Sequence, residues 1–548
     1  MENDMVIKNH FVKGTEVSSL IDRSDKRFVC CKVDGHVQDL NYILPRDMDA
    51  EIEFLDLTNP EATKIYESSL RLLVYIAIKR IDEKLDVRFF YNVSRSIFCR
   101  VNGRKNMRIT SRFVEAVRRE MERLVSQDLP IRKKRMSKEE ALAIYRKEGL
   151  HDKIDVLRYR PENFAHLYEV SVDGKSYHDY LYSPMVPSTG YLKKYNLRFY
   201  QPGFLIQVPR AECQGEIPPF SDELQFAITL AGASRWAEKN DIDTVSNINR
   251  FLKKYGALAL INVGESRIAN MLTDLGRDIA NSDDPIRVIC VAGPSSSGKT
   301  SFANRLTFEL MSLGLRPIRI SIDDFYIPKN ELGSEVDIES VEAIDIPYFS
   351  QVINGLIQGE KVRLPTYSFK EGIRRIGKEF SIQSNQPIII EGIHALNARL
   401  TANIPEHQKY KIYIAPQPQV NIDNHTPLSM SDLRLIRRIS RDARTRGSDA
   451  KETIAMWPNV RNGEFRYIYP TEENADFIFD SFLPYETCAM RNIVLPLLDA
   501  IAPEDAEYTV AQRLKSIVKY FLPIPSDDVP CNSLLREFIG GSSFKDAR

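Results

Sequence analysis

Residues 293–300 read GPSSSGKT and follow directly on the apolar run IRVICVA at 286–292. Glycines at the first and sixth positions of this stretch allow backbone angles that turn successive N–H groups toward the oxygens of a phosphate. The lysine side chain can reach the outer phosphates of a nucleotide, and the threonine hydroxyl can bind Mg²⁺. The stretch therefore predicts a nucleotide phosphate site, called the phosphate loop below, made of Gly293, Pro294, Ser295, Ser296, Ser297, Gly298, Lys299 and Thr300.

The residues around the phosphate loop favour a strand before it and a helix after it. The pattern GxxxxGK[ST] arises by chance in roughly 2 of 100 chains of this length at average residue usage. Here helical spacing continues after the loop to Leu313, and Gly314 is suited to end a helix. The positive N-terminal end of such a helix would face the same anion. A coincidental serine-rich turn is therefore a poor alternative.

Strand-like and helical segments alternate through the second half of the chain. Between helical segments, apolar runs of strand length stand at 286–292, 316–322, 387–390, 410–415 and 475–479. This alternation predicts an α/β domain with a parallel sheet covered by helices on both faces. Because the breaker sequence NSDDP ends at Pro285, we expect this domain at 285–500, followed by a helical extension at 501–548.

The first half of the chain has a different pattern of apolar and polar residues, which predicts α+β structure. Residues 27–57 alternate apolar and polar side chains around a hairpin signal, Asp34-Gly35, and indicate a small β-rich domain. A later basic stretch, Arg132 to Lys147, is expected to be helical. The expected divisions are a β-rich domain at 1–60, a second domain at 61–215, and a connector at 216–284 with helices over 221–240 and 246–281.

Composition narrows the class of protein. Of 548 residues, 43% are hydrophobic and 27% are charged, and 75 basic side chains balance 75 acidic ones, so no basic excess points to nucleic acid. The seven cysteines include no CxxC pair, which favours reduced thiols over a zinc site or a disulfide frame. The sequence has no signal-peptide pattern and no run of about 18 apolar residues. We therefore expect a cytoplasmic protein without a membrane segment, and its oligomeric state stays open.

Two of the expected strands in the second half end in acidic residues. Asp323 follows the run at 316–322, and Glu391 follows the run at 387–390. The carboxyl ends of parallel strands border the crevice where such sheets bind ligands. Asp323 there could accept the proton of an attacking hydroxyl, and Glu391 could contact Mg²⁺ through water. Without the phosphate loop, a helix cap or a surface turn would be an equally good interpretation of Asp323.

An arginine-rich stretch, RLIRRISRDARTRG, begins at Arg434. At helical spacing, Arg434, Arg437, Arg438 and Arg441 fall on one face. Such an array can hold phosphates that gain negative charge during a reaction. A solvated charged helix is the usual interpretation of a charge run, but here only Asp442 lies within the run to pair the cations. The balance therefore favours an anion-binding role.

The motifs GPSSSGKT, SIDDFY, LPTYSF, IIIEGIH and RLIRRISRDARTRG occur in this order across about 285–500. Together they resemble the uridine kinase and phosphoribulokinase family of phosphate-loop kinases. The resemblance implies a kinase that uses ATP and Mg²⁺, with Asp323 as its catalytic base. The further roles it implies are catalysis for Lys299, Arg438 and Arg441, a lid over ATP for Arg446, metal binding for Thr300 and Glu391, and substrate binding for Asp337, Tyr367, Phe369, Arg374 and Arg438.

The resemblance is incomplete where the family binds its acceptor. Uridine kinases typically carry P-x-Y-D-F-x-x-H-x-R, whereas this chain has Ser368 in place of the aspartate and Gly372 in place of the histidine. A site that lacks a polar partner loses discrimination for the group that the partner held. The sequence therefore supports phosphoryl transfer more directly than it supports a particular acceptor.

The first half resembles the start of threonyl-tRNA synthetases. Residues 27–57 are similar to their small β-grasp TGS domain, and residues 61 to about 210 are similar to the editing domain that follows it. The positions of that domain's metal-binding and editing residues hold Glu67, Arg71, Leu181 and Met185. A set with two apolar members and an arginine cannot bind zinc, so the resemblance implies the fold without the hydrolase.

The leading hypothesis is a kinase that transfers the γ-phosphate of ATP to the 5′-hydroxyl of uridine or cytidine. One alternative is a kinase for a different small hydroxyl acceptor. Another is an RNA- or ribosome-associated regulator that uses ATP as a switch, suggested by the TGS-like region and by the basic stretch from Arg132. We prefer a solvated helix face for that stretch by about three to one, so nucleic acid is the less favoured partner. A generic NTPase would leave Asp323 and Tyr367 unexplained.

Overall fold

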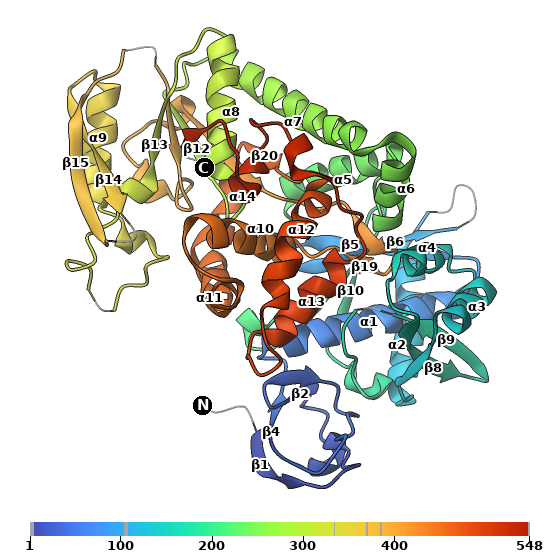
Figure 1. The fold of residues 1–548 in the computed structure, drawn as a ribbon. Helices are drawn as coiled ribbons and strands as arrows, with labels where there is room; N and C mark the ends of the chain where they lie inside the picture. The colour runs from blue at the N-terminus through green and yellow to red at the C-terminus, as the bar shows by residue number, and fades with distance from the viewer. Residues whose placement is uncertain are drawn as a thin grey trace.

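The computed structural model describes residues 5–103, 108–180, 182–333, 335–368, 371–383 and 386–545. Figure 1 shows a small β-rich lobe at the N-terminus and a larger body in which the two halves of the chain pack together. The first half contains three antiparallel sheets, with strand orders β1-β4-β2-β3, β10-β11-β6-β5 and β7-β8-β9. Among the described residues, no helix is both long and apolar enough to cross a membrane.

The N-terminal lobe is a four-stranded sheet followed by a long helix. Its elements are β1 (Met5–Phe11), β2 (Cys30–Val33), β3 (His36–Gln38), β4 (Met48–Leu55) and α1 (Pro60–Ile81). The predicted hairpin is confirmed, because β2 and β3 pair antiparallel with Val33 opposite His36. The side chain of Asn59 accepts a hydrogen bond from the backbone N–H of Glu61 at 2.9 Å, and this cap begins α1.

Residues 82–215 surround α1 with strands and short helices. The elements are β5 (Asp86–Val93), β6 (Ser96–Asn102), α2 (Ser111–Ser126), β7 (Arg132–Ser137), α3 (Lys138–Glu148), α4 (His151–Tyr159), β8 (Phe164–Val172), β9 (Lys175–Asp179), β10 (Asn196–Tyr200) and β11 (Gly203–Gln207). The prediction of one basic helix from Arg132 was wrong, since the first part of the stretch is an edge strand paired with β8. Ser137 and Glu140 form a capping box that starts α3 only after that strand.

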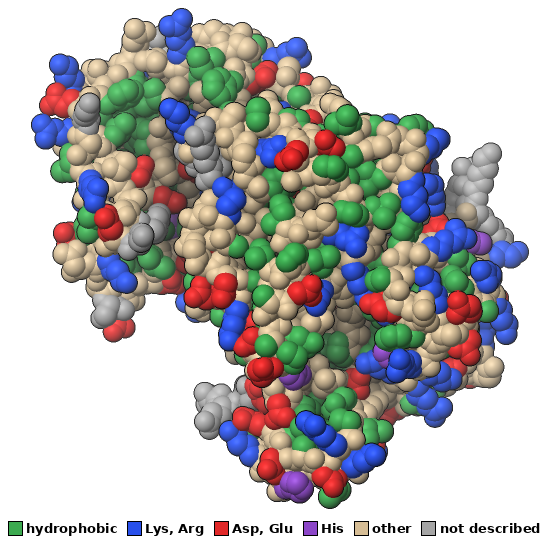
Figure 2. Space-filling model, viewed as in Figure 1, with side chains coloured by type: hydrophobic (Ala, Val, Ile, Leu, Met, Phe, Trp, Pro, Cys, Tyr) green, Lys and Arg blue, Asp and Glu red, His purple; other side chains and the backbone are tan. Residues whose placement is uncertain are grey.

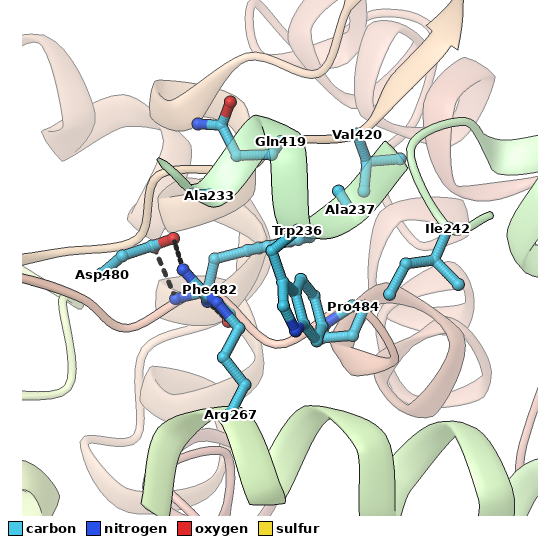
Figure 3. Close-up of a pocket in the computed structure, with 10 residues that line it drawn as sticks. All are labelled: Ala233, Trp236, Ala237, Ile242, Arg267, Gln419, Val420, Asp480, Phe482 and Pro484. Atoms are coloured by element: carbon cyan, nitrogen blue, oxygen red, sulfur yellow. Dashed lines mark hydrogen bonds and ion pairs between the residues drawn. The ribbon is translucent and has the colours of Figure 1, made fainter. Parts of the chain in front are cut away.

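Three helices connect the two halves, namely α5 (Leu224–Lys239), α6 (Val245–Tyr255) and α7 (Ala257–Ala280). The single helix predicted over 246–281 is interrupted at Gly256, so α6 and α7 are separate. Figure 3 shows Arg267 of α7 reaching Asp480, with an ion-pair distance of 2.7 Å. The cavity beside this pair holds about 10 Å³, which is room for about one water molecule. The contact therefore joins the connector to the second half and leaves no room for a substrate.

A five-stranded parallel sheet forms the centre of the second half. Its strands, in spatial order, are β13 (Ile318–Ser321), β16 (Ile388–Glu391), β12 (Val288–Ala292), β17 (Lys409–Ala415) and β20 (Phe477–Asp480). All four pairings are parallel, as the sequence predicted. Side chains of β12 alternate between two hydrophobic clusters, with Ile289 and Val291 in one and Val288 and Cys290 in the other. Both faces of the sheet are therefore covered.

Helices and two hairpins complete the second half. The remaining elements are α8 (Lys299–Ser312), α9 (Ile346–Ile357), β14 (Val362–Ser368), β15 (Ile373–Phe380), β18 (Asn421–Asp423), β19 (Thr426–Pro427), α10 (Met430–Thr445), α11 (Ala450–Gly463), α12 (Glu486–Asp499), α13 (Tyr508–Val518) and α14 (Arg536–Ile539). The β18–β19 hairpin inserts between the halves, where the backbone N–H of Phe89 in β5 donates to the carbonyl of Asn424 at 2.9 Å.

A buried charged cluster fixes this hairpin to the first half. The ammonium group of Lys153 in α4 pairs with Asp179 and with Asp423, the latter at 3.0 Å. Asp179 also accepts from the ring of His425 at 2.5 Å. Burial lowers the pKa of Lys153, but the two carboxylates outweigh it, so the net pKa is raised and the lysine stays charged. These buried ion pairs therefore join the two halves of the chain.

We predict that Lys153→Met destabilises the whole chain by about 3–5 kcal/mol, because two carboxylates would stay buried without their shared cation. Thermal and urea unfolding of the purified protein would measure the loss. Lys147→Met, at an exposed position of α3, is the matched control and should change stability by less than about 0.5 kcal/mol. Equal stability of the two variants would contradict a structural role for the cluster.

Candidate active site

The phosphate loop joins β12 to α8 at the carboxyl edge of the sheet. Gly293 lies where no side chain fits, because an added Cβ would come 2.0 Å from the carbonyl oxygen of Ile414 in β17. The loop turns back through a hydrogen bond from the N–H of Ser297 to the carbonyl of Pro294, at 3.2 Å. This close path is the reason the pattern needs glycine at its first position.

Polar groups of the loop and of the first turn of α8 are buried but incompletely satisfied. The hydroxyls of Ser296, Ser297 and Ser301 are buried, and none has a hydrogen-bond partner among the described residues. Lys299 folds back over the loop, where its ammonium group donates to the carbonyls of Gly293 at 3.0 Å and of the next residue at 3.2 Å. Such unsatisfied donors around a cation fit an anion site that is ready to receive a phosphate.

The charges of two carboxylates, Glu391 and Asp323, act on Lys299. Asp323 follows β13, and Glu391 is the last residue of the neighbouring strand β16, where the register places it opposite Ser321. Burial raises the pKa of Asp323, while Lys299 and Arg446 oppose the shift. Burial and the nearby charge of Asp323 raise the pKa of Glu391 to about 7. The sheet thus brings a cation and two proton-accepting groups to one edge.

Two arginines of α10 hold the phosphate loop from outside. Arg434 is fully buried, forms an ion pair with Glu464, and donates from its Nε to the carbonyl of Ser295 at 2.8 Å. Arg437 is almost fully buried, pairs with Glu486 at 2.6 Å, and reaches the next two loop carbonyls at 3.4 Å each. Both side chains therefore bind the protein's own backbone and acids.

The expectation that these two arginines act as free anion ligands needs correction. The sequence argument counted acids only within the charge run, but the partner acids lie 30 residues after Arg434 and 49 residues after Arg437. No local signal in the run marks those partners, because they come from the segment after α11 and from α12. Arg434 and Arg437 are scaffold residues of the loop.

The later arginines of α10 gather around one buried acid. Asp442 pairs with Arg438 at 3.2 Å, with Arg441 at 2.8 Å and with Arg446 at 3.6 Å. Three cations share one carboxylate, so the cluster keeps a net positive charge. Arg438 also donates to the hydroxyl of Ser295 in the phosphate loop at 2.9 Å. This cluster can therefore bind an anion next to the loop.

Residues predicted for the acceptor gather around Tyr326. The ring of Tyr367 lies 5.7 Å from that of Tyr326. Burial raises the pKa of Tyr326, and the charges of Asp323 and Asp337 add to the shift. Asp337 is exposed and accepts from the hydroxyl of Tyr467 at 3.4 Å. The structure thus places Tyr367 and Asp337 on the same side as the candidate base.

Other parts of the predicted acceptor site are arranged differently. Arg374 pairs with Asp345 at 2.9 Å. Its guanidinium is therefore bound at the start of α9. Gly372 has a φ of 68°, and an added Cβ would lie 2.9 Å from the Cβ of Lys329. A histidine at position 372 would therefore strain this turn. Phe369 lies outside the described residues.

Sequence reasoning missed several residues near this side. His394 is buried, burial lowers its pKa to about 4, and its ring centroid lies 6.3 Å from that of Tyr467. Burial raises the pKa of Glu339, while Arg438 opposes the shift. The motif IIIEGIH contained His394, but nothing in the pattern indicated that it would be a buried neutral side chain.

A hollow of about 360 Å³ lies under the β14–β15 hairpin, lined in part by Ser321, Asp324, Leu364 and Phe380. Figure 2 shows the surface hollowed between the side that carries this hairpin and the side that carries α10 and α11. The backbone N–H of Tyr367 donates to the carboxylate of Asp324 at 3.1 Å and ties the hairpin to the strand end. The volume suits a small molecule.

Comparisons with known proteins show which family the second half is similar to. Residues 288–487 match the model of the phosphoribulokinase and uridine kinase family. A uridine kinase of Saccharomyces cerevisiae is 27% identical over 258 residues, which cover 46% of this chain and 46% of that protein. The chain therefore spans about half the length of this relative. A uridine kinase of Borrelia duttonii is 29% identical over 197 residues, which cover 35% of this chain and 85% of that protein.

Among solved structures, a possible uridine kinase from Bacillus stearothermophilus matches with a TM-score of 0.29 and 16% sequence identity. The match covers 39% of this chain and all of that one. The family match itself rests on the sequence of the second half, and it includes the phosphate loop, Asp323, Glu391 and α10. Residues 288–487 are thus similar in sequence to the phosphoribulokinase and uridine kinase family.

Proposed function

We propose that this chain transfers the γ-phosphate of ATP to a hydroxyl of a small molecule, with the 5′-hydroxyl of uridine or cytidine as the favoured acceptor. The observation that carries the proposal is the grouping of Lys299, Asp323 and Glu391 at one edge of the parallel sheet, next to the phosphate loop. Uridine kinases among the relatives support a nucleoside acceptor.

Asp323 is the proposed base. Its pKa is raised by burial, and a carboxylate with a raised pKa accepts a proton from a hydroxyl more readily than an ordinary one. The charge of Lys299 opposes this rise in the pKa of Asp323. Arg438, which donates to Ser295, and Arg441, which pairs with the same Asp442, would hold the transferred group as its charge grows.

The residues present also fit ATP and Mg²⁺. The buried hydroxyls of Ser296, Ser297 and Ser301 are the kind of unsatisfied groups that a triphosphate would meet. Thr300 at the start of α8 and Glu391 at the end of β16 supply the oxygen ligands that Mg²⁺ prefers. When bound, Mg²⁺ would neutralise charge on the phosphate oxygens.

The alternative of an RNA-associated regulator gains little support. The basic stretch that motivated it is β7, and its cations meet local partners. Lys134 pairs with Glu169, Lys133 lies 3.6 Å from Asp39, and Arg135 lies over the ring of Phe164. Cations engaged by such local partners are less available to a phosphate backbone.

For the first half, we propose an editing-like domain without its metal site. The site positions Glu67 and Arg71 form an ion pair at 3.3 Å, and Arg210 also pairs with Glu67, at 3.2 Å. Met185 is buried, and Leu181 lies outside the described residues. Within the described ranges, no group of three or more His, Cys, Asp or Glu side chains could hold a metal. The ion pairs of Glu67 support this proposal, because they engage two of the four positions in question.

Replacing the base tests the proposed reaction. Asp323→Asn should lower turnover by about 10²–10⁴-fold, because the acceptor hydroxyl would lose its proton acceptor, while ATP affinity should change by less than about threefold. A coupled ADP-release assay and calorimetric ATP binding measure the two quantities. Asp283→Asn, at an exposed position before β12, is the matched control. Full activity of Asp323→Asn would contradict the assignment.

A panel of acceptors tests the substrate. We expect ATP-dependent phosphorylation of uridine or cytidine, and weaker turnover of pantothenate, sugar phosphates and polyols. Chromatography of the nucleoside monophosphate measures the product. Turnover of only a non-nucleoside would reject the favoured acceptor and keep the kinase. ATP binding with no turnover of any acceptor would favour the regulator instead.

A further inference from the structure

A carboxylate from far along the chain sits on the first turn of α8. Glu537 in α14 accepts a hydrogen bond from the backbone N–H of Ser301 at 3.2 Å, across 236 residues of sequence. The first N–H groups of a helix have no partner within the helix, and in a phosphate loop they are donors to nucleotide phosphates. Glu537 therefore occupies a position that an inner phosphate of ATP would need.

The segment that carries Glu537 is firmly attached to both helices of the nucleotide site. We call residues 526–545 the strap. Phe538 is buried under the guanidinium of Arg437, 5.0 Å from its ring centroid, and its carbonyl accepts from the hydroxyl of Ser440 at 3.0 Å. The carbonyl of Glu537 accepts from Arg444 at 3.0 Å. Figure 1 shows α14 lying beside α10 and α8.

A second anchor lies at the other side of the strap. The ring of Phe544 stacks on that of Phe308 in α8, with centroids 6.1 Å apart. Ser533, near the start of the strap, shares a hydrogen bond with the hydroxyl of Tyr485 at 3.0 Å. These anchors hold the backbone of the strap in place, so the carboxylate of Glu537 stays at high local concentration over the loop.

The contact satisfies only part of the anion site. Gly298, which precedes α8, supplies no side-chain cap, so Glu537 caps the helix from outside. The hydroxyl of Ser301 next to it is fully buried and has no hydrogen-bond partner among the described residues. A carboxylate fills one position of a site whose remaining donors still await an anion. Glu537 thus takes the place of a phosphate. A triphosphate, which has more oxygens, can displace it.

We propose that the strap is an autoinhibitory element in which Glu537 occupies the position of an inner nucleotide phosphate and competes with ATP for the N–H of Ser301. The inference rests on the proposed ATP-binding function of the loop and adds a regulatory contact to it. Displacement requires that the carboxylate of Glu537 leave the N–H of Ser301, which removes one of the contacts that hold α14 against α8. An anion at a helix N-terminus is bound severalfold more tightly than a neutral group, so the competition should weaken ATP binding by about three- to tenfold.

The test compares the full-length protein with Glu537→Gln by calorimetric titration. ATP with Mg²⁺ and inorganic tripolyphosphate should both bind Glu537→Gln about three- to tenfold more tightly than they bind the wild type. Adenosine, which has no phosphate, should bind the two proteins equally. Glu504→Gln removes the same charge at an exposed position between α12 and α13 and should leave every affinity unchanged.

Two results would overturn the strap proposal while leaving ATP binding intact. One is equal ATP affinity of wild type and Glu537→Gln. The other is weaker binding by Glu537→Gln, which would make Glu537 a supporting part of the nucleotide site. Absence of ATP binding by both proteins would instead contradict the proposed function, and the strap inference with it.

Hydrogen exchange on the wild-type protein gives a second measurement that needs no variant. Saturating ATP should speed exchange of the amides of residues 536–545, because the bound nucleotide displaces Glu537 and loosens α14. Amides of α13 serve as the internal reference and should not change. Slower or unchanged exchange in the strap would contradict competition, even if Glu537→Gln failed to fold.

Discussion

Two buried ion pairs position the phosphate loop, and the rest of the site depends on them. Arg434 with Glu464 and Arg437 with Glu486 lie almost wholly out of solvent. Burying such pairs costs desolvation energy that their attraction only roughly offsets, so their contribution is mainly geometric. Their spare N–H groups bind the carbonyls of the loop from outside. The carbonyls of Ser295, Ser296 and Ser297 face α10 as a result.

Local signals in the sequence predicted the parts of this fold that are local in origin. The phosphate loop follows from glycine and lysine at fixed spacing, and the parallel strands follow from short apolar runs that end in acids such as Asp323 and Glu391. The basic stretch from Arg132 was misjudged, because pairing of β7 with β8 overrides local helical preference. Strand pairing of this kind depends on a segment about 30 residues away.

The parts of the site that could not be predicted depend on long-range partners. Glu464 and Glu486 pair with Arg434 and Arg437 and so keep these arginines from binding an anion. Neither glutamate belongs to a recognisable motif. Gly372 is another position that local sequence could not explain. The family pattern has a histidine there. Only the structure shows that its turn has a positive φ and lies against Lys329. The departure is thus a different turn, not a simple exchange of one side chain for another.

Helix α10 contacts the phosphate loop and the strap, and it is linked to the first half through Arg513. At its start, Asp432 pairs with Arg513 at 3.1 Å, and Arg513 also pairs with Glu61 of α1 at 2.7 Å. Its middle holds the phosphate loop through Arg434 and Arg437, and its end holds the strap through Ser440. Close-packed interiors transmit displacements because buried side chains cannot yield independently. A shift of α10 would therefore move the loop and the strap together, whereas a shift of Glu537 alone would leave the loop in place. The strap can compete with a nucleotide without distorting the site that binds it.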